Sequence, residues 1–311
     1  MKDKKIIITG GAGFIGSNLA WKLCEDNEVI VIDDLSSGKI ENIKDLIDEG
    51  KIKFVIGSVT DYKLLNKNFQ DTDYVFHEAA IASVPQSFDD PINTNNVNIN
   101  GTVNVFRAAV ENNIKKVVWA SSCAIYGDSN NPPIKENDTV NPLSPYALSK
   151  FVGECYAKIF IDHNKLPIVS LRYFNVYGQM QNPDGDYAAV IPIFIKKALK
   201  NNDLTIFGNG KQTRDFINVS DVVDANIFAA ENNIKGVFNI GTGEKTSINS
   251  IAEKIIELSQ NDVDIKYGEA REGDIKHSFS DISSMKSKGF EPKVNLDEGL
   301  KMTLKWFNNN S

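Results

Sequence analysis

Short apolar segments recur along the first 175 residues, and stretches with helical spacing separate most of them. Residues 6–9 lead into glycines, after which apolar residues recur at helical spacing from Phe14 to Trp21. This pattern predicts a strand, a tight turn and a helix. Further strands are predicted at residues 28–32, 53–55, 74–77, 116–120 and 167–172. Such regular alternation indicates an α/β fold with a doubly wound parallel sheet that helices cover on both faces.

The alternation loosens after Tyr177. A stretch rich in Gly, Pro, Asn and Asp at residues 179–187 leads into an amphipathic helix at 190–199, then into short strands and a mixed tail. We therefore expect two domains, residues 1–175 and a smaller α/β domain at residues 176–311. Segments near residues 215–240 can still pack back on the first domain, so the boundary need not be one clean cut.

The composition indicates a folded protein. In 311 residues, 41% are hydrophobic, which is enough for a core and excludes a disordered or fibrous chain. The 34 Lys+Arg against 41 Asp+Glu give a net charge of −7, which makes nucleic acid and anionic membranes unfavourable partners. Three scattered cysteines and the absence of a signal peptide or a long apolar run predict a cytoplasmic protein without a disulfide or metal site.

The sequence GGAGFIG places Gly10, Gly13 and Gly16 between the first strand and the first helix. Glycine permits positive φ, close approach of a pyrophosphate, and tight packing of helix on strand, while the helix N-terminus favours the phosphate charge. Asp33 and Asp34 follow 17 positions after Gly16, where a carboxylate can accept the ribose hydroxyls of adenosine and repel a 2′-phosphate. This predicts NAD rather than NADP; the alternative is a glycine turn with an incidental acidic pair.

A second motif places Tyr146 and Lys150 four residues apart on one helical face, with Pro145 suited to the first turn. A nearby ammonium stabilises phenolate, so we expect Lys150 to lower the pKa of Tyr146 and make it a usable base. Ser122 ends the fifth strand at the carboxyl edge of the sheet and can hydrogen-bond the same substrate hydroxyl. Tyr–Lys pairs at this spacing also occur on ordinary helices; the position of Ser122 favours the catalytic interpretation.

Together these motifs resemble the extended short-chain dehydrogenase/reductase superfamily, whose dinucleotide domain has the Rossmann fold. The resemblance rests on the glycine pattern and on SCAIYG and SPYALSK around Ser122, Tyr146 and Lys150. The segments RYFNVYG, TRDF and REGD further resemble its nucleotide-sugar epimerases, so the likeness covers essentially the whole chain. It implies a UDP-sugar bound between the domains and a homodimer formed through helices such as residues 96–110 and 146–162.

The resemblance also implies which residues contact NAD. Ser58 departs from the family, which usually has an Asp there to accept a hydrogen bond from adenine; a serine hydroxyl can still accept one. The expected NAD contacts are Gly10, Gly13, Phe14, Ile15, Gly16, Asp33, Asp34, Ser36, Ser37, Gly38, Ser58, Val59, Ala79, Ala80, Ala82, Asn98, Ser121, Tyr146, Lys150 and Phe174.

The UDP-sugar contacts implied by the resemblance lie mostly in the second domain. Arg214 and Arg271 can each grip the diphosphate, although an ion pair between Arg214 and Asp215 is the alternative. Asp274 suits the uridine ribose, and Phe207 suits the uracil unless it is a core aromatic. The expected substrate contacts are Ser83, Ser122, Tyr146, Asn175, Gln181, Ala189, Val190, Thr205, Phe207, Arg214, Arg271, Asp274 and Ser278.

The implied reaction is epimerisation at C4 of a UDP-hexose. Tyr146 takes the 4-hydroxyl proton while C4 passes hydride to NAD, and the resulting 4-keto sugar turns over and is reduced on its other face. Dehydratase relatives carry an Asp-Glu pair where this chain has Cys123 and Ala124, so elimination is disfavoured.

The sugar is suggested by a pocket position. Ser278 is small at a position that is bulky in glucose-restricted members of the family, which favours UDP-N-acetylglucosamine and UDP-N-acetylgalactosamine, with UDP-glucose and UDP-galactose also accepted. Three alternatives stay open: a UDP-glucose 4-epimerase only, a UDP-glucuronate-type epimerase, and a non-enzymatic NAD-binding sensor.

Overall fold

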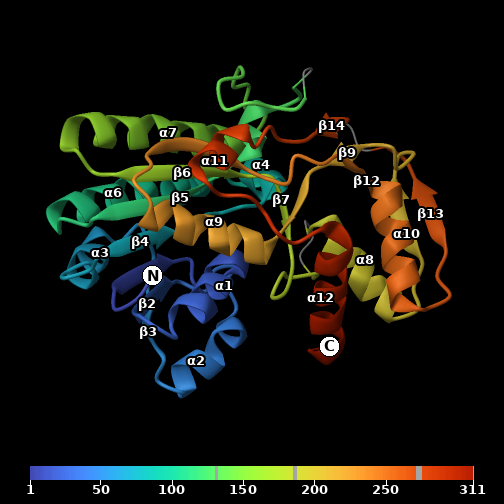
Figure 1. Ribbon diagram of the computed structural model, residues 1–311, viewed down its shortest axis with the longest axis horizontal. Helices are drawn as coiled ribbons and strands as arrows, with labels where there is room; N and C mark the ends of the chain where they lie inside the picture. Colours follow the sequence, from blue (N-terminus) through green and yellow to red (C-terminus); the bar gives the residue numbers. More distant parts are fainter. Residues whose placement is uncertain (130–131, 185–187, 271–274, 311) are drawn as a thin grey trace. The chain divides into compact units, whose positions relative to one another are not determined.

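The computed structural model describes residues 1–129, 132–184, 188–270 and 275–310 (Figure 1). Their contacts divide the chain into two compact units. The first unit comprises Met1–Gly127, Thr139–Tyr173 and Val223–Phe238. The second comprises Asp128–Asp138, Phe174–Val222 and Asn239–Ser311.

A seven-stranded sheet forms the centre of the first unit, in the order β11-β6-β5-β4-β1-β2-β3. Strands β1 to β6 pair in parallel, and β11 lies at the edge beside β6. The strand order reverses between β1 and β4, which is where sheets of this kind bind ligands at their carboxyl ends. The strands are β1 (Lys5–Thr9), β2 (Glu28–Asp33), β3 (Ile52–Ile56), β4 (Tyr74–His77), β5 (Lys116–Ser122), β6 (Ile168–Tyr173) and β11 (Gly236–Ile240).

Helices pack on this sheet through apolar side chains. Leu65 of α3, Phe106 of α6 and Ala157 of α7 share a buried core with Val117 and Trp119 of β5. The first unit contains α1 (Phe14–Leu23), α2 (Lys44–Asp48), α3 (Tyr62–Asn68), α4 (Val84–Asp89), α5 (Pro91–Asn95), α6 (Thr102–Glu111) and α7 (Pro145–Asn164). A π-helical segment (Asn96–Gly101) precedes α6, and 3-10 turns lie at Ile40–Asn42 and Cys123–Tyr126.

The close approach of α7 to β5 depends on Gly153. A Cβ at this glycine would lie 2.3 Å from Cη2 of Trp119, a side chain that is completely buried. Because no side chain separates helix from strand here, α7 lies against the sheet with Tyr146 and Lys150 near the carboxyl end of β5.

The second unit combines small sheets with four helices around its own core. Its sheets pair β10 with β7, β12 with β9 and β14, and β13 with β8. The strands are β7 (Asn175–Tyr177), β8 (Leu204–Phe207), β9 (Thr213–Arg214), β10 (Phe216–Asn218), β12 (Thr246–Ser247), β13 (Ile265–Gly268) and β14 (His277–Ser278). The helices are α8 (Val190–Leu199), α10 (Ile248–Ser259), α11 (Ser283–Lys288) and α12 (Leu296–Asn309); α9 (Val219–Glu231) runs from this unit into the first.

The predicted α/β fold with a parallel central sheet is confirmed, and the six predicted strands are present. Strands β1, β2, β3 and β5 are one or two residues longer than predicted, β4 has the predicted bounds, and β6 is shifted by one residue. Residues 128–138, which the sequence analysis places in the first domain, cluster with the second unit, because Ile134 forms a parallel bridge with Ser280. Residues 223–238 cluster with the first unit, where β11 adds to the sheet.

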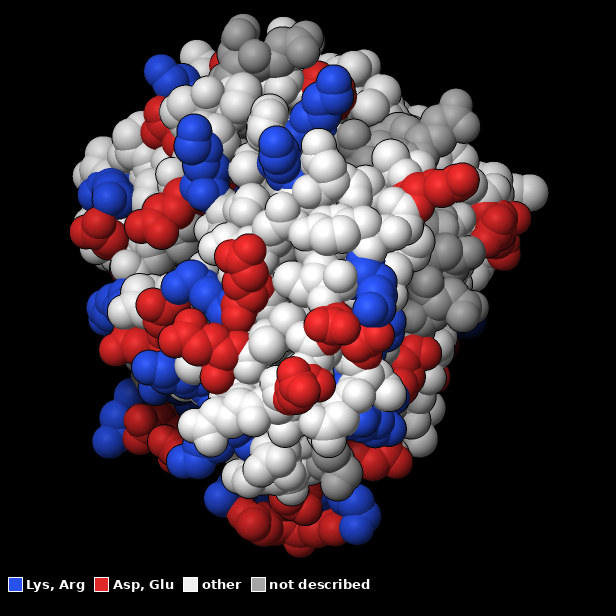
Figure 2. Space-filling view, turned by 90° about the vertical axis from the view of Figure 1, so that its right-hand side faces the viewer, with Lys and Arg blue, Asp and Glu red and all other residues white. Residues whose placement is uncertain are grey.

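Charged side chains of both signs are interspersed on the face drawn in Figure 2, with uncharged surface between them. This distribution agrees with the modest net charge of −7. Within the described residues, no helix is both long and apolar enough to span a membrane.

Candidate active site

The glycine turn between β1 and α1 is shaped by close backbone contacts. Gly10 has a φ of +71°, and a Cβ there would lie 2.6 Å from the amide nitrogen of Ala79. At Gly16 a Cβ would lie 2.2 Å from the carbonyl oxygen of Gly10. Gly13 is the N-cap of α1, which continues with Phe14 and Ile15, and no side chain caps this helix end. The first amide groups of α1 therefore suit an anionic ligand.

Asp33 at the end of β2 is fixed beside this turn. Its carboxylate accepts hydrogen bonds from the backbone N–H of Ala12 at 2.9 Å and of Leu35 at 2.8 Å. Burial raises its pKa, while the two backbone hydrogen bonds act in the opposite direction. A Cβ on Gly38 would lie 2.9 Å from Oδ1 of Asp33, so the loop with Ser36 and Ser37 returns close to the carboxylate.

Other expected cofactor residues lie at the ends of neighbouring strands. Ser58 follows β3 and accepts a hydrogen bond from the Thr60 hydroxyl at 3.1 Å. The side-chain amide of Asn98 makes its hydrogen bonds within the protein. Its oxygen accepts the N–H of Ile81, and its nitrogen donates to the Ile81 carbonyl and to Ser149 Oγ, the latter at 3.0 Å. Asn98 therefore fixes the loop that follows β4. That loop carries Ala79, Ala80, Ala82 and Ser83, the last being the N-cap of α4, whereas Val59 lies next to Ser58 in the loop after β3.

Ser122, Tyr146 and Lys150 come together at the carboxyl end of β5. Ser122 Oγ accepts the N–H of Ala124 at 3.1 Å and hydrogen-bonds the hydroxyl of Tyr146. Ser144 is the N-cap of α7, and Pro145 occupies the first turn as predicted. The backbone N–H of Tyr146 donates to the hydroxyl of Ser87 on α4 at 3.1 Å. The expected grouping of these three side chains is present in the described structure.

Lys150 is buried and directed to the strand. Its Nζ donates to the carbonyl oxygen of Ala120 at 2.8 Å and lies 5.8 Å from the ring centroid of Tyr146 and 5.5 Å from that of Trp119. Burial lowers the pKa of its ammonium to about 8, because the charged form loses solvation.

The pKa of Tyr146 differs from the sequence-based expectation. Burial raises it to about 12, and the hydrogen bond from Ser122 acts in the opposite direction. The expectation that Lys150 brings the phenol into the range of a base is therefore wrong for this state of the protein. Desolvation outweighs stabilisation of phenolate, and Tyr146 is protonated at neutral pH.

His77 at the end of β4 is a neutral structural residue. The Thr102 hydroxyl donates to the Asn98 carbonyl at 2.7 Å, so it accepts from Nε2–H of His77 at 2.9 Å. Nδ1 then accepts from the Thr9 hydroxyl at 2.7 Å. Burial lowers the pKa of the imidazole to about 3, so it carries no charge near Lys150 at neutral pH.

In the second unit, the completely buried Asp215 directly follows Arg214 and hydrogen-bonds Asn175. Asp215 accepts five hydrogen bonds, from Thr242, Gly243 and Ser280, at 2.5 to 3.1 Å. These contacts occupy both carboxylate oxygens, which disfavours the alternative of an Arg214–Asp215 ion pair. The Asp215 carbonyl accepts the backbone and side-chain N–H groups of Asn175 at 2.9 and 3.2 Å.

The remaining expected substrate residues lie at several places in the second unit. Ser278 is buried in β14 and pairs in register with Arg214 of β9. Phe207 ends β8 with 41% of its surface exposed, so it is not a core aromatic. Gln181 bonds the Val176 carbonyl, Ala189 is the N-cap of α8, Val190 is its first residue, and Thr205 lies in β8. Phe174, an expected cofactor residue, begins the second of the three stretches of this unit. Arg271 and Asp274 lie outside the described residues.

Comparison with known proteins places this site in a family. The model of the family "NAD dependent epimerase/dehydratase" matches residues 6–241. The chain belongs to this family.

A putative UDP-glucose 4-epimerase of Methanocaldococcus jannaschii is 41% identical over 98% of this chain and 99% of its own length. A UDP-N-acetyl-alpha-D-glucosaminuronate decarboxylase of Bacillus cytotoxicus is 35% identical over 98% of each. The structure of the UDP-N-acetylglucosamine 4-epimerase of Methanobrevibacter ruminantium, in complex with UDP-N-acetylmuramic acid, superposes with a TM-score of 0.97 and 43% identity over 100% of both chains.

The glycine turn fits the cofactor of the epimerase/dehydratase family. Gly10 and Gly16 leave no room for side chains, α1 begins without a side-chain cap, and Asp33 is held at the end of β2. These are the features that a pyrophosphate and an adenosine ribose require. The predicted NAD dependence is therefore confirmed.

Sequence reasoning missed several polar residues that build this site. Glu154 lies four positions after Lys150 and bonds Arg172 at 2.9 and 2.7 Å, and Ser121 Oγ donates to the same carboxylate at 2.5 Å. Glu78 directly follows β4 and accepts from the Tyr173 hydroxyl at 3.0 Å. Their positions at strand ends and on the Tyr146 helix were the available signals.

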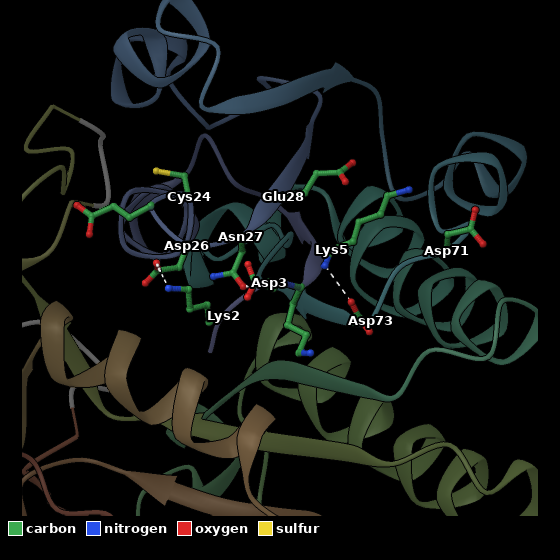
Figure 3. Close-up of a pocket in the computed structure, with 11 residues that line it drawn as sticks. Lys2, Asp3, Lys5, Cys24, Asp26, Asn27, Glu28, Asp71 and Asp73 are labelled. Atoms are coloured by element: carbon green, nitrogen blue, oxygen red, sulfur yellow. Dashed lines mark hydrogen bonds and ion pairs between the residues drawn. The ribbon is translucent and has the colours of Figure 1, made fainter.

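A cavity of about 790 Å³ lies at the other end of the sheet (Figure 3). Lys5, Glu28 and Asp73 line it at the amino ends of β1, β2 and β4, together with Lys2 and Asp26. Two of its lining side chains, Lys2 and Asp26, form an ion pair. Since Ser122 and the glycine turn lie at the carboxyl ends of the strands, this cavity is separate from the candidate site. The described residues contain no group of three or more His, Cys, Asp or Glu that could hold a metal ion.

Proposed function

We propose that this enzyme inverts the configuration at C4 of a UDP-hexose through a transient 4-keto sugar. UDP-N-acetylglucosamine and UDP-N-acetylgalactosamine are the preferred pair, and UDP-glucose and UDP-galactose are also accepted. The observation that carries the proposal is the grouping of Ser122, Tyr146 and Lys150: Nζ of Lys150 lies 5.8 Å from the Tyr146 ring centroid and donates to the Ala120 carbonyl, two residues before Ser122 on β5. The full-length similarity to proteins named UDP-sugar 4-epimerases supports the same reaction.

Tyr146 acts first as base and then as acid. It removes the proton of the sugar 4-hydroxyl and returns a proton after the keto sugar has presented its opposite face. NAD held by the glycine turn and Asp33 would supply the acceptor and donor of the C4 hydride and, in its oxidised form, a positive charge in the site. That charge and the Ser122 hydrogen bond both favour the phenolate form of Tyr146, which burial alone opposes.

Ser122 and Lys150 hold the reacting groups. Because Ser122 Oγ accepts the N–H of Ala124, its own proton is directed to another acceptor, either Tyr146 or the sugar oxygen. Lys150, fixed by the Ala120 carbonyl, supplies a buried positive charge on the same helix as Tyr146.

Two neighbouring residues favour epimerisation over dehydration. Expulsion of the 6-hydroxyl needs an acid and a base close to the sugar. Cys123 and Ala124 directly follow Ser122 in a 3-10 turn, and neither offers the carboxyl groups that such proton transfers use.

The second unit supplies the substrate contacts in this proposal. Arg214 and Arg271 bind the diphosphate, with Asn175 beside Arg214 through Asp215. The small side chain of Ser278, adjacent to Arg214 in the sheet, leaves room for an acetamido group. A smaller sugar loses only a few contacts, which costs about 1 to 3 kcal/mol, so plain hexoses are still accepted.

We also propose a homodimer. Large apolar side chains are exposed on neighbouring helices of the first unit, and α4, α5 and α7 contact one another. The exposed residues are Val84, Phe88, Ile92, Leu148 and Ile159. Several exposed apolar side chains on neighbouring helices are typical of protein–protein interfaces. The cytoplasmic location stays a prediction.

The test uses the purified protein with no added cofactor. A panel of UDP-sugars is incubated with it, and products are identified by NMR. We expect UDP-N-acetylglucosamine to equilibrate with UDP-N-acetylgalactosamine, and NAD to be released when the protein is denatured. The absence of any C4 epimer from all the UDP-sugars, with NAD bound, contradicts the proposal and favours an NAD-binding sensor.

A further inference from the structure

Glu78 places a carboxyl group between the glycine turn and the catalytic strand. It directly follows β4, and its backbone N–H donates to the Thr9 carbonyl at 3.1 Å. A Cβ on Gly10 would lie 2.9 Å from the carbonyl carbon of Glu78. On the other side, β4 pairs with β5 so that His77 lies opposite Trp119, which puts Glu78 beside Ala120. Ala120 is the residue whose carbonyl accepts the ammonium of Lys150.

A chain of hydrogen bonds fixes the Glu78 side chain. Asn226 of α9 is completely buried, and its Nδ2 donates to the Tyr173 hydroxyl oxygen at 2.8 Å. The single proton of the Tyr173 hydroxyl has two acceptors in reach, Oε1 of Glu78 at 3.0 Å and Oδ1 of Asn226 at 3.1 Å, and a carboxylate is the stronger acceptor of the two. These hydrogen bonds join α9, β6 and the end of β4 within the first unit. The last group in the series is the carboxyl group of Glu78.

The ionisable groups around Glu78 are those of the catalytic site. Lys150 and Tyr146 belong to α7 and Tyr173 to β6, while His77, on β4 itself, is neutral. Cys123, in the turn after β5, acts on Tyr146 together with Glu78. Burial raises the pKa of Glu78 to about 7, while Tyr173 and Lys150 act in the opposite direction. The Glu78 charge in turn raises the pKa values of both Tyr146 and Lys150.

We propose that Glu78, held by Tyr173, is a positioning residue that sets the charge state of Tyr146 and Lys150 and thereby the pH range of catalysis. Its carboxylate keeps Lys150 in the ammonium form and opposes release of the Tyr146 proton. This inference rests on the proposed function for its catalytic consequence, but not for the electrostatic interaction itself.

The alternative is a purely structural role, in which Glu78 only ties β4 to β6. The two roles differ in what the loss of charge does. A structural tie survives replacement by an isosteric acceptor, because the Tyr173 hydroxyl can donate to an amide oxygen as well as to a carboxylate. The electrostatic role does not survive it.

The main test is Glu78→Gln in the holoenzyme. The phenolate of Tyr146 is titrated by ultraviolet absorbance as the difference between each protein and the same protein carrying Tyr146→Phe, and kcat is measured against pH. Removal of the negative charge is expected to lower the pKa of Lys150 and, to a smaller extent, the pKa of Tyr146, on which Cys123 also acts. The whole pH profile of kcat therefore shifts toward acid.

Asp73→Asn is the matched control. Asp73 is the residue before β4, and Glu78 is the residue after it. The Asp73 carboxylate accepts a hydrogen bond from the backbone N–H of Lys5 at 2.9 Å. It is paired with Lys115 at the amino end of the sheet, away from the catalytic residues. We expect Asp73→Asn to leave the Tyr146 titration and the pH profile unchanged.

Tyr173→Phe gives an independent test that retains the carboxylate. Loss of the hydrogen bond raises the pKa of Glu78. The Glu78 carboxyl group is therefore expected to become charged, and to act on Lys150 and Tyr146, only at a higher pH than in the unmodified enzyme. A Tyr146 titration and a pH profile of kcat that are both unshifted in Glu78→Gln overturn the inference even if the enzyme is an active epimerase. Shifted titrations in a protein that epimerises no UDP-sugar support the electrostatic interaction and contradict only the proposed function.

Discussion

Arg172 of β6 and Glu154 of α7 form a two-point ion pair inside the first unit, with Nε to Oε1 at 2.9 Å and Nη2 to Oε2 at 2.7 Å. Both side chains are buried, and Arg172 also donates to the Tyr126 hydroxyl at 2.6 Å. Ser121 donates to Glu154 at 2.5 Å. The pair thus ties the strand end that carries Ser122 to the helix that carries Tyr146 and Lys150.

Glu154→Gln is expected to destabilise the protein by about 3 kcal/mol, because it leaves the Arg172 charge buried without its partner. The measurement is the free energy of unfolding in urea. The control is Asp162→Asn on the same helix, which breaks the exposed pair with Lys158 and should leave stability unchanged. Equal effects from the two variants contradict the assigned importance of the buried pair.

Tyr146→Phe is expected to reduce kcat by at least about 100-fold, since it removes the proton acceptor and donor while keeping the ring. Bound NAD and the free energy of unfolding should stay as in the unmodified enzyme. Tyr156→Phe, a partly exposed tyrosine on the same helix, should retain activity. Normal turnover by Tyr146→Phe rules out its assigned role.

Asp33→Asn is expected to weaken NAD binding by about 10-fold and to improve the relative affinity for NADP. The neutral amide is a poorer acceptor for two ribose hydroxyls and no longer repels a 2′-phosphate. Affinities are compared by reconstituting the apo protein with each dinucleotide in a calorimeter. Asp45→Asn, an exposed change on α2, is the control. An unchanged NAD-to-NADP preference refutes the contact.

Ser278→Tyr tests the proposed sugar preference. A large side chain at this buried position of β14 should lower kcat/KM for UDP-N-acetylglucosamine by more than about 10-fold and spare UDP-glucose. Ser278→Ala, which keeps the space open, should accept both sugars. If Ser278→Tyr handles the acetylated sugar normally, the residue does not control access.

Ile92→Asp tests the proposed dimer. Ile92 on α5 is 83% exposed, so a charge there costs the monomer little but disrupts an apolar interface. Sedimentation velocity should show a dimer for the unmodified protein and a monomer for the variant. Met302→Asp on α12, also exposed, should leave the dimer intact. A monomeric unmodified protein disproves the assignment.

Local features of the sequence predicted the frame of the site. The glycine turn, Asp33, Ser122 and the Tyr146 helix each follow from a short motif or from helical periodicity, and the structure brings the catalytic side chains together. Such features depend on near neighbours in the chain, which the sequence displays directly.

Effects that depend on distant segments were not predictable in this way. The pKa of Tyr146 depends on how deeply the phenol is buried and on Glu78, which lies 68 positions earlier. The five hydrogen bonds of Asp215 come from residues at least 27 positions away, so its local TRDF motif suggested only an ion pair with its neighbour.

Each of the two units is assembled from three separate stretches of chain. A single crossover between two genes of this family therefore cannot exchange one complete unit for its counterpart. Changes of sugar specificity by recombination would require several coordinated exchanges, whereas a substitution at one position such as Ser278 requires none. Chimaeric enzymes built from these units accordingly need five junctions, at the boundaries after residues 127, 138, 173, 222 and 238.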